Sequence, residues 1–441
     1  MRKLILLLTF FIAALAAAPA GAYTYDVCRN PIKWPSNLVI WNVSSTSFGG
    51  TPWEASLNTA RNAWNDAPGN NFNIGYYWTT DVSTNTSDGK NSILMPSNWS
   101  DGGALAVTYT RRPFCFFFST GSHWQEADML FNPNKTWDTS TNPPAPVDAP
   151  FNSTIVATHE HGHGLGLLHE NDTFALMNEY YPGGGVVGTA YQVQPHADDV
   201  AGARNLYKPS TPYTVRDVAA TPYRHSTSDG RASEPIPAPS AFYRGQTISF
   251  QFTVENRGNI TENVPVYFYA SATRQVTTSS RLLGTAQLSI PAGVSATPTL
   301  SVPIPTNGPW DYQYLGWIID PLNSIPEIDE GNNGATLIRR TNFIWNYLPT
   351  ACFTASATSG STPFTVQVNA SCSSDQDGSP LTYTWDFGDG NIATGVTASN
   401  TYWIAGTYDI LLTVHDGQSA AYEWRRIHVS CNNTFCPEEP Y

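Results

Sequence analysis

The sequence predicts an α+β domain at its N-terminal end, followed by two all-β sandwiches. Helical and strand-like patterns are mixed before residue 208, whereas the residues beyond 213 show alternating strands without helical spacing. Proline-bearing segments at 208–212 and 347–350 separate these parts of the chain. A chain of 441 residues is long enough for about two to four domains, each with a core of its own.

Residues 1–22 have the pattern of an export signal peptide. Arg2 and Lys3 precede an apolar run over 4–18, and Ala20-Gly21-Ala22 supplies the small residues of a cleavage site. We therefore expect a secreted, extracellular protein whose mature chain begins at Tyr23. A retained N-terminal anchor is the alternative, but the run is short for a membrane span. No later stretch approaches spanning length, so no membrane span is expected.

The balance of acidic and basic residues excludes some classes of binding partner. The chain has 22 Lys and Arg against 35 Asp and Glu, which gives a net charge of −13, and charged residues make up only 13%. Binding to nucleic acid requires a dense basic face, because the phosphates must be neutralised. The acidic balance therefore argues against a nucleic-acid partner, and equally against a polybasic membrane contact.

The first domain is predicted to combine helices and strands over residues 23–208. Apolar residues at helical spacing predict a helix at 53–67, which ends at Pro68-Gly69. Short apolar runs predict strands at 38–43, 91–95 and 105–110.

The two later parts, at 213–345 and 350–430, are predicted to be sandwiches. Residues 247–255 and 264–270 alternate between apolar and polar side chains and are bounded by turn residues, as in antiparallel sheets. In the second sandwich, Trp385 and Phe387 are expected to alternate with Asp386 across a strand. Residues 431–441 are predicted to form a C-terminal tail.

Residues 159–169 carry the pattern HExxHxxGxxH, which predicts a catalytic zinc site. His159 and His163 are four residues apart, so on a helix their imidazoles share one face and can bind one metal ion. Gly166 can adopt a positive φ and turn the chain so that His169 becomes the third ligand. Glu160 lies beside them, where its carboxylate can act as a general base toward zinc-activated water. His161 lies about 200° around the helix from His159 and is not expected to be a ligand.

The motif and its flanks resemble the metzincin zinc endopeptidases, and within them the matrixins. Ala175-Leu176-Met177 resembles the family's Met-turn, whose methionine lies beneath the metal ligands. Residues 198–207 are similar to the closing helix, and residues 126–132 resemble the edge strand that pairs with substrate. The resemblance implies an α+β metzincin catalytic domain, with a mixed twisted sheet and an active-site helix, that cleaves protein or peptide substrates with one catalytic zinc ion.

The sequence also departs from the matrixin pattern near the site. Met177 is followed by Asn178-Glu179-Tyr180-Tyr181 without the family's proline, so we expect Tyr181 to form the wall of the specificity pocket. The histidine pattern of the matrixins' second zinc is not evident, although His123 and Asp128 are candidates for another site.

The later domains resemble two modules of exported proteins. Residues 213–345 are similar to the cell-adhesion-related CARDB domain through 252–258 and 328–333. Residues 350–430 resemble a PKD-type Ig-like domain through 383–390. We expect these modules to contact extracellular matrix protein or polysaccharide, or else to act as inert spacers. The acidic cluster at 375–378 is expected to form turns, with calcium binding as the alternative.

The six cysteines are disulfide candidates, because export favours pairing. Proximity within the domains favours the pairs Cys28–Cys115, Cys352–Cys372 and Cys431–Cys436 among the 15 full pairings that are possible. For Cys28 the alternative is a thiolate that caps the zinc and keeps the enzyme latent, but the switch sequence of the family's propeptide is absent.

Together these features predict a secreted zinc-dependent endopeptidase with Glu160 as general base. The competing hypothesis is a surface adhesion protein whose N-terminal domain is an inactive peptidase. Because the linker after Lys208 is short and carries prolines, we further expect few contacts to cross it and residues 23–208 to fold alone.

Overall fold

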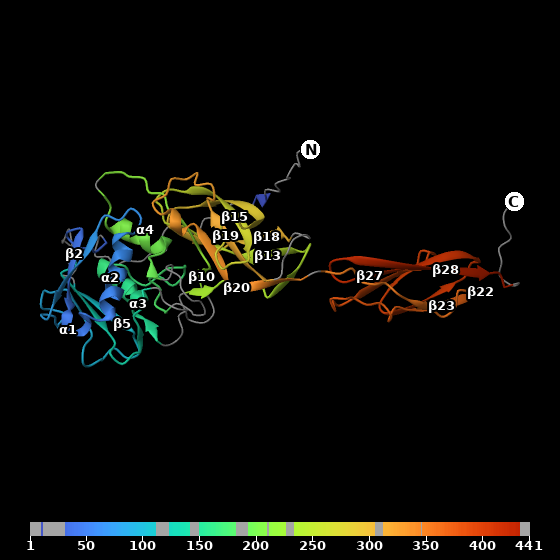
Figure 1. The fold of residues 1–441 in the computed structure, drawn as a ribbon, viewed down its shortest axis with the longest axis horizontal. Coiled ribbons are helices and arrows are strands. Elements are labelled where there is room, and N and C mark those ends of the chain that lie inside the picture. The colour runs from blue at the N-terminus through green and yellow to red at the C-terminus, as the bar shows by residue number, and fades with distance from the viewer. Residues whose placement is uncertain are drawn as a thin grey trace, which may run out of the picture. The chain divides into compact units, whose positions relative to one another are not determined.

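The computed structural model describes residues 10–11, 31–111, 123–141, 150–181, 193–209, 211–225, 233–304, 312–344 and 346–432. Its elements confirm the predicted fold class, because helices and strands mix in the first domain and strands dominate the two that follow (Figure 1). The chain forms two compact units. One comprises Met1–Ser240, Thr247–Pro303 and Tyr312–Asn342, and the other comprises Ala241–Gln246, Ile304–Asp311 and Phe343–Tyr441.

The N-terminal domain, which we take as residues 31–209, is built from strands and helices that pack together. Its elements are β2 (Leu38–Ser44), α1 (Ser45–Phe48), α2 (Pro52–Asn65), β3 (Asn73–Thr79), β4 (Ser92–Leu94), β5 (Ala106–Arg111), β6 (Glu126–Phe131), β7 (Trp137–Asp138), β8 (Phe151–Asn152), α3 (Ser153–Leu165) and α4 (Ala197–Leu206). α2 and α3 pack against each other, and both contact the sheet. The predicted helix at 53–67 corresponds to α2, and the three predicted strands to β2, β4 and β5.

The main sheet of this domain has the order β3-β2-β4-β6-β5. Its first four strands are parallel, and β5 pairs antiparallel with β6. The expectation that residues 126–132 form the edge strand is wrong, because β6 lies between β4 and β5 and all six of its residues are buried. The outer strand on this side is β5, whose residues become exposed toward Arg111.

The helices α2 and α3 are held in place by large aromatic side chains. Trp64 of α2 donates its indole N–H to the carbonyl of Thr158 at 2.7 Å. Trp41 of β2 packs against Gly164 of α3, where an added Cβ would lie 2.6 Å from the ring. This close approach explains why α3 contains a residue with low helix propensity.

The first sandwich, residues 213–344, consists of short and long antiparallel strands. Its elements are β9 (Val218–Thr221), β10 (Tyr223–His225), β11 (Ser233–Pro235), β12 (Ala241–Tyr243), β13 (Thr247–Gln251), β14 (Thr253–Asn256), β15 (Glu262–Ser271), β16 (Arg281–Ile290), β17 (Val294–Ala296), β18 (Thr299–Pro303), β19 (Tyr312–Ile319), the 3-10 turn η2 (Glu330–Asn332) and β20 (Gly334–Ile344). One sheet contains β16-β15-β19-β20, and β17-β14-β9 and β13-β18 form further sheets. Phe252, Phe268 and Trp317 meet in its core.

The predicted single strand at 247–255 is divided in the structure. β13 pairs with β18, whereas β14 pairs with β9 and β17, so the chain changes sheets at Phe252. The alternation of buried and exposed residues holds in β13 but fails in β14, where all four residues are buried.

Several contacts join the N-terminal domain to the first sandwich. Arg204 of α4 donates to the carbonyl of Gly258 at 2.6 Å, and Tyr213 donates to the carbonyl of Gly69 at 3.0 Å. Phe174 packs with Tyr223 and Ile338 in a small apolar cluster. The expectation that few contacts cross Lys208 is therefore wrong, and these contacts lie within one compact unit.

The second sandwich has a three-stranded sheet, β21-β23-β26, and a five-stranded sheet, β22-β28-β27-β24-β25. Its strands are β21 (Thr354–Ala355), β22 (Ser359–Ser361), β23 (Phe364–Asn369), β24 (Thr382–Asp386), β25 (Ile392–Thr394), β26 (Thr397–Tyr402), β27 (Gly406–His415) and β28 (Ala420–Ser430). Trp385 and Phe387 are buried and Asp386 is exposed, as the alternation predicts.

The cysteines that the structure describes belong to the second sandwich and its C-terminal edge. Cys352 and Cys372 form a disulfide with a Cα–Cα distance of 5.4 Å, and Cys431 is also disulfide-bonded. Cys28, Cys115 and Cys436 lie outside the described residues.

Only two residues are described within the predicted signal peptide. They form β1 (Phe10–Phe11), which pairs in parallel with β16. In the described ranges, no helix is long and apolar enough to cross a bilayer.

Candidate metal centre and its cavity

The helix α3 has a defined beginning and end, which together place the HExxHxxGxxH motif. At its start, the side chain of Asn152 accepts a hydrogen bond from the backbone N–H of Ile155 at 3.0 Å. At its end, Gly166 has φ = 108°, a left-handed conformation that favours glycine. A Cβ at Gly166 would also lie 2.8 Å from the indole nitrogen of Trp124. The chain turns there and returns toward the helix at His169.

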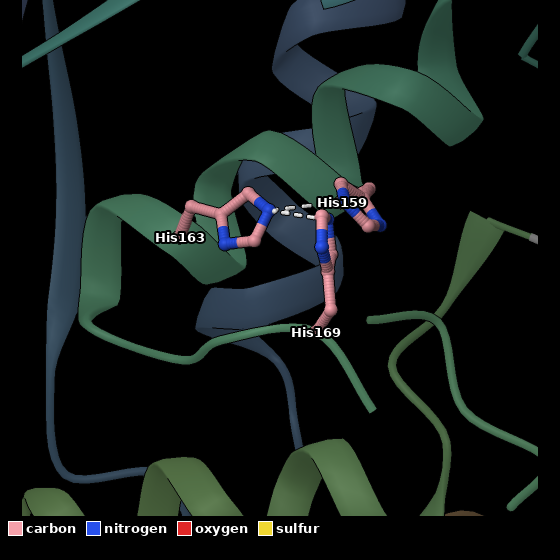
Figure 2. Close-up of side chains that lie close together, drawn as sticks. All are labelled: His159, His163 and His169. Carbon is pink, nitrogen blue, oxygen red and sulfur yellow. Dashed lines mark hydrogen bonds between the residues drawn. The ribbon is translucent and has the colours of Figure 1, made fainter. Parts of the chain in front are cut away.

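Three histidine side chains converge where the motif predicts a metal site (Figure 2). The Nε2 atom of His163 lies 3.1 Å from that of His159 and 3.1 Å from that of His169. One candidate ligand atom from each residue lies within 4.8 Å of the other two. The described residues contain one such group of three histidine, cysteine or acidic side chains.

The orientation of two imidazoles is set by backbone carbonyls. His159 donates from Nδ1 to the carbonyl of Leu176 at 2.8 Å, and His163 donates from Nδ1 to the carbonyl of Leu167 at 2.8 Å. In a neutral ring this leaves a lone pair on Nε2, the atom that faces the other histidines. The sequence does not indicate these carbonyls, because any residue type provides one.

The surroundings of the three histidines favour the neutral form of each ring, because the pKa of each is lowered. Burial lowers the pKa of His159 well below its usual range, and the nearby His163 adds to this effect. Burial and the neighbouring His163 also lower the pKa of His169 to about 4. Three neutral nitrogen donors facing one point are the ligand set of a catalytic zinc ion, which binds imidazole nitrogen at about 2.0–2.1 Å. The residues present therefore fit zinc.

Glu160 lies beside the histidines and is almost fully buried, with 5% of its surface exposed. Thr108 of β5 donates from Oγ1 to the Glu160 carboxylate at 2.6 Å. Burial raises the pKa of Glu160 to about 7, although the Thr108 hydrogen bond opposes the shift. A carboxyl group with a pKa near neutrality can both accept and return a proton. No sequence pattern indicates Thr108, which lies 52 residues away.

His161 has a different role, as its position on the helix predicts. Its Nε2 lies 2.7 Å from the hydroxyl of Tyr76, and its Nδ1 bonds to the carbonyl of Ala157. The ring is buried among these groups and close to Trp41. His161 is therefore part of the core and not of the metal centre.

Met177 lies beneath the helix that carries the ligands, in a buried segment. A Cβ on Gly162 would lie 2.2 Å from the sulfur of Met177, so the methionine packs directly against the helix backbone. Asp199 of α4 accepts hydrogen bonds from the backbone N–H groups of Leu176 at 2.7 Å and Met177 at 3.0 Å. The sequence places Asp199 in a closing helix but does not predict this contact.

A cavity of about 790 Å³ opens over the three histidines and Glu160. Residues of β5, of α3 and of the segment 176–181 line it. Tyr181 lies in this lining, and its hydroxyl accepts a hydrogen bond from the backbone N–H of Asn152 at 2.9 Å. Tyr180 also lines the cavity, but 47% of its surface is exposed.

The two candidates for another metal site lie in separate surroundings. His123 is exposed, with Nδ1 3.3 Å from the carbonyl of Lys33. Asp128 is buried in β6 and accepts from the backbone N–H of Ser92 at 2.9 Å. The structure does not bring them together with a third ligand among the described residues.

Comparison with known families matches all three parts of the chain. The matrixin family matches residues 33–208, the CARDB family 235–337 and the PKD domain family 346–430. A curated relative is human matrix metalloproteinase-20, which is 26% identical over 180 residues. The match covers 40% of this chain and 32% of the relative, so the chain spans about a third of that protein's length.

Parts of the chain are also similar to solved domains. The PKD1 domain of the Vibrio cholerae metalloprotease PrtV is 29% identical, with 19% of this chain and 99% of that chain covered and a TM-score of 0.17. The CARDB domain of a Pyrococcus furiosus protein, in complex with di-metal ions, is 16% identical, with 30% of this chain and 100% of that chain covered and a TM-score of 0.22. On the three family matches, this chain carries a matrixin domain, a CARDB domain and a PKD domain, in that order.

Proposed function

We propose that this protein is a secreted zinc-dependent endopeptidase that hydrolyses peptide bonds in extracellular proteins. The observation that carries the proposal is the convergence of His159, His163 and His169 beside Glu160, inside a cavity bordered by β5. The matrixin match over residues 33–208 and the likeness to a matrix metalloproteinase support the same activity.

The outer strand of the sheet supplies a way to bind substrate. β5 borders the cavity and, among the described residues, has a strand partner on one side only, β6. An extended peptide can add to such an edge through backbone hydrogen bonds, whatever its sequence. The apolar side chains of Leu105, Val107 and Leu168 then offer contacts to substrate side chains, and Tyr181 forms one wall.

The chemistry divides between the metal and the Glu160 carboxylate. His159, His163 and His169 would hold a zinc ion, which would polarise a peptide carbonyl and lower the pKa of a water molecule. Glu160 accepts the proton from the attacking water and returns it to the departing amine. Thr108 holds one carboxylate oxygen and so fixes the direction of the other.

The remaining parts of the proposal concern location and partners. Residues 1–22 direct export, and the mature chain begins at Tyr23. The CARDB and PKD domains contact matrix protein or polysaccharide and bring the matrixin domain to insoluble substrates. Calcium binding at residues 375–378 stays a prediction. Asp375 accepts hydrogen bonds from the N–H groups of Asp377 and Ser379, as the turn-forming alternative expects.

The decisive test is Glu160→Gln in the full-length protein, with Glu54→Gln in α2 as a matched control. We expect Glu160→Gln to bind one zinc ion per chain and to lose peptide cleavage by about a hundredfold or more, because the amide cannot accept the proton. Glu54→Gln should keep both properties. Zinc content is measured by mass spectrometry and cleavage on a denatured protein mixture. A wild-type protein that binds zinc but cleaves nothing would favour the inactive, adhesive alternative.

A further inference from the structure

The first sandwich reaches into the N-terminal domain through a buried carboxylate. Glu255 of β14 is fully buried, and its two oxygens contact the start of α4. One oxygen lies 3.1 Å from Nδ1 of His196, and the other accepts from the backbone N–H of Ala197 at 2.9 Å. The first N–H groups of a helix lack partners within the helix, and its N-terminus favours negative charge. Glu255, which belongs to another domain, therefore supplies a hydrogen-bond acceptor for the first N–H group of α4.

The charge on Glu255 is maintained in this buried position. Burial opposes ionisation, but His196 and Arg257 outweigh it, so the pKa of Glu255 lies below its usual range. Arg257 lies 3.8 Å from one carboxylate oxygen and donates to the side chain of Gln194 at 3.0 Å. Glu255 thus makes a charged, hydrogen-bonded contact between the two domains.

The same turn of α4 holds the segment beneath the metal centre. Asp199 accepts from the backbone N–H of His196 at 2.8 Å, and also from those of Leu176 and Met177. Phe174, two residues before Leu176, packs against His196 with a ring-centroid distance of 4.0 Å and tilted ring planes, and it also packs with Tyr223 of the sandwich.

Leu176 completes the connection to the metal centre. Its N–H donates to Asp199, and its carbonyl accepts from Nδ1 of His159. A chain of direct contacts therefore leads from Glu255 through the first turn of α4, Asp199 and Leu176 to the ligand His159. Groups that orient a ligating histidine affect metal affinity, typically by about 10–100-fold when they are removed.

We propose that Glu255 of the CARDB domain is a positioning residue for the metal centre of the matrixin domain. It fixes the start of α4, and through Asp199 and Leu176 it fixes the direction of His159. The CARDB domain is then part of the catalytic framework and not only a module for attachment. This inference rests on the proposed function only in taking His159 as a zinc ligand.

The test compares Glu255→Gln with wild type in the full-length protein, first without metal. Glutamine keeps the size but replaces one acceptor oxygen by a donor, so it cannot accept from both His196 and Ala197. We expect amide hydrogen exchange at Leu176 and Met177 to accelerate about tenfold. Zinc affinity, measured by competition with a chelator, should weaken by about tenfold.

Glu262→Gln is the matched control, because Glu262 is a buried carboxylate of the same sandwich that pairs with Arg216. It should leave exchange at Leu176 and zinc affinity unchanged. If Glu255→Gln lowers thermal stability but leaves both readouts at wild-type values, its role is merely structural and the inference is overturned. Should Glu255→Gln not fold, Glu255→Asp withdraws the carboxylate from the start of α4 by one methylene group, keeps the charge, and is judged by the same readouts. A wild-type protein that binds no zinc refutes the proposed function. The comparison of amide hydrogen exchange at Leu176 and Met177 still tests whether Glu255 holds this segment in place.

Discussion

Gly164 shows how a single missing side chain shapes the helix that carries the candidate metal ligands. It follows His163 directly, and a Cβ there would lie 2.6 Å from the ring of Trp41. In an isolated helix, Gly164→Ala would stabilise by about 1 kcal/mol. Here we expect the opposite sign, because overpacking a buried site costs about 1–3 kcal/mol. Denaturant unfolding of the metal-free protein measures the difference.

The control for this substitution is Gly103→Ala. A Cβ added at Gly103 would have no neighbouring atom within 4 Å, so alanine there should leave stability unchanged. A Gly164→Ala variant as stable as wild type would show that Trp41 moves aside without cost, and that the close contact does not constrain α3.

At the scale of residues, the sequence predicts what lies close along the chain. The offsets of His159, His163 and His169 follow from one helical turn and one glycine, so a local pattern suffices. Thr108 and Asp199 act on the same site from 52 and 22 positions away from the groups they contact. A threonine in a strand and an aspartate in a helix carry no signal for such contacts until the fold is known.

At the scale of elements, the start of α3 affects the stability of the candidate site, because this helix carries two candidate ligands and Glu160. Asn152 caps it by accepting from Ile155, and its amide donates to the carbonyl of Ser140 at 2.8 Å. We expect Asn152→Ala to lower the free energy of unfolding by about 1–2 kcal/mol, because the cap is lost. Urea denaturation of the metal-free protein checks the value.

Asn85→Ala provides the comparison for Asn152→Ala. Asn85 is exposed in a loop of the same domain, so its side chain should contribute little to stability. Equal stability of both variants would mean that the Asn152 side chain is not needed to begin α3.

Two elements illustrate why strand patterns do not determine a strand's place in a sheet. The resemblance to matrixins places residues 126–132 at the edge, but β6 is interior and β5 is the outer strand. Both segments are short and apolar enough to be strands, and their order depends on pairing between distant residues. In β14, alternation would place Glu255 in solvent, yet the start of α4 covers that face and buries it.

At the scale of the whole molecule, composition and proline-bearing linkers predict three domains, in the order that the family matches confirm. They do not predict how the first two cooperate. A short linker suggests independence, but the surfaces on either side of it are complementary: Arg204 donates to the carbonyl of Gly258, and Phe174 packs with Tyr223. Linker composition describes chain flexibility and carries no information about the surfaces that meet.

Two truncations separate the roles of the later domains. A chain that ends at Ile344 loses the PKD domain but keeps Glu255, Tyr223 and Ile338 beside the matrixin domain. We expect it to cleave a soluble peptide and bind zinc within about twofold of the full-length protein, since every contact described around the metal centre remains. On an insoluble protein matrix we expect it to be slower, because the PKD domain no longer tethers the proposed peptidase.

A chain that ends at Lys208 is expected to behave differently. It loses the carboxylate at the start of α4 and exposes the apolar face of Phe174, whose burial with Tyr223 contributes about 1.5–3 kcal/mol. The segment that orients His159 then keeps its hydrogen bonds to Asp199 and its core packing, but α4, which carries Asp199, has lost its contact with Glu255. We expect zinc affinity and soluble-peptide cleavage to fall by about tenfold or more, together with a lower thermal midpoint. Equal activity of the two truncated chains on the soluble peptide would contradict this, because it would show that the matrixin domain holds its metal centre without the CARDB domain.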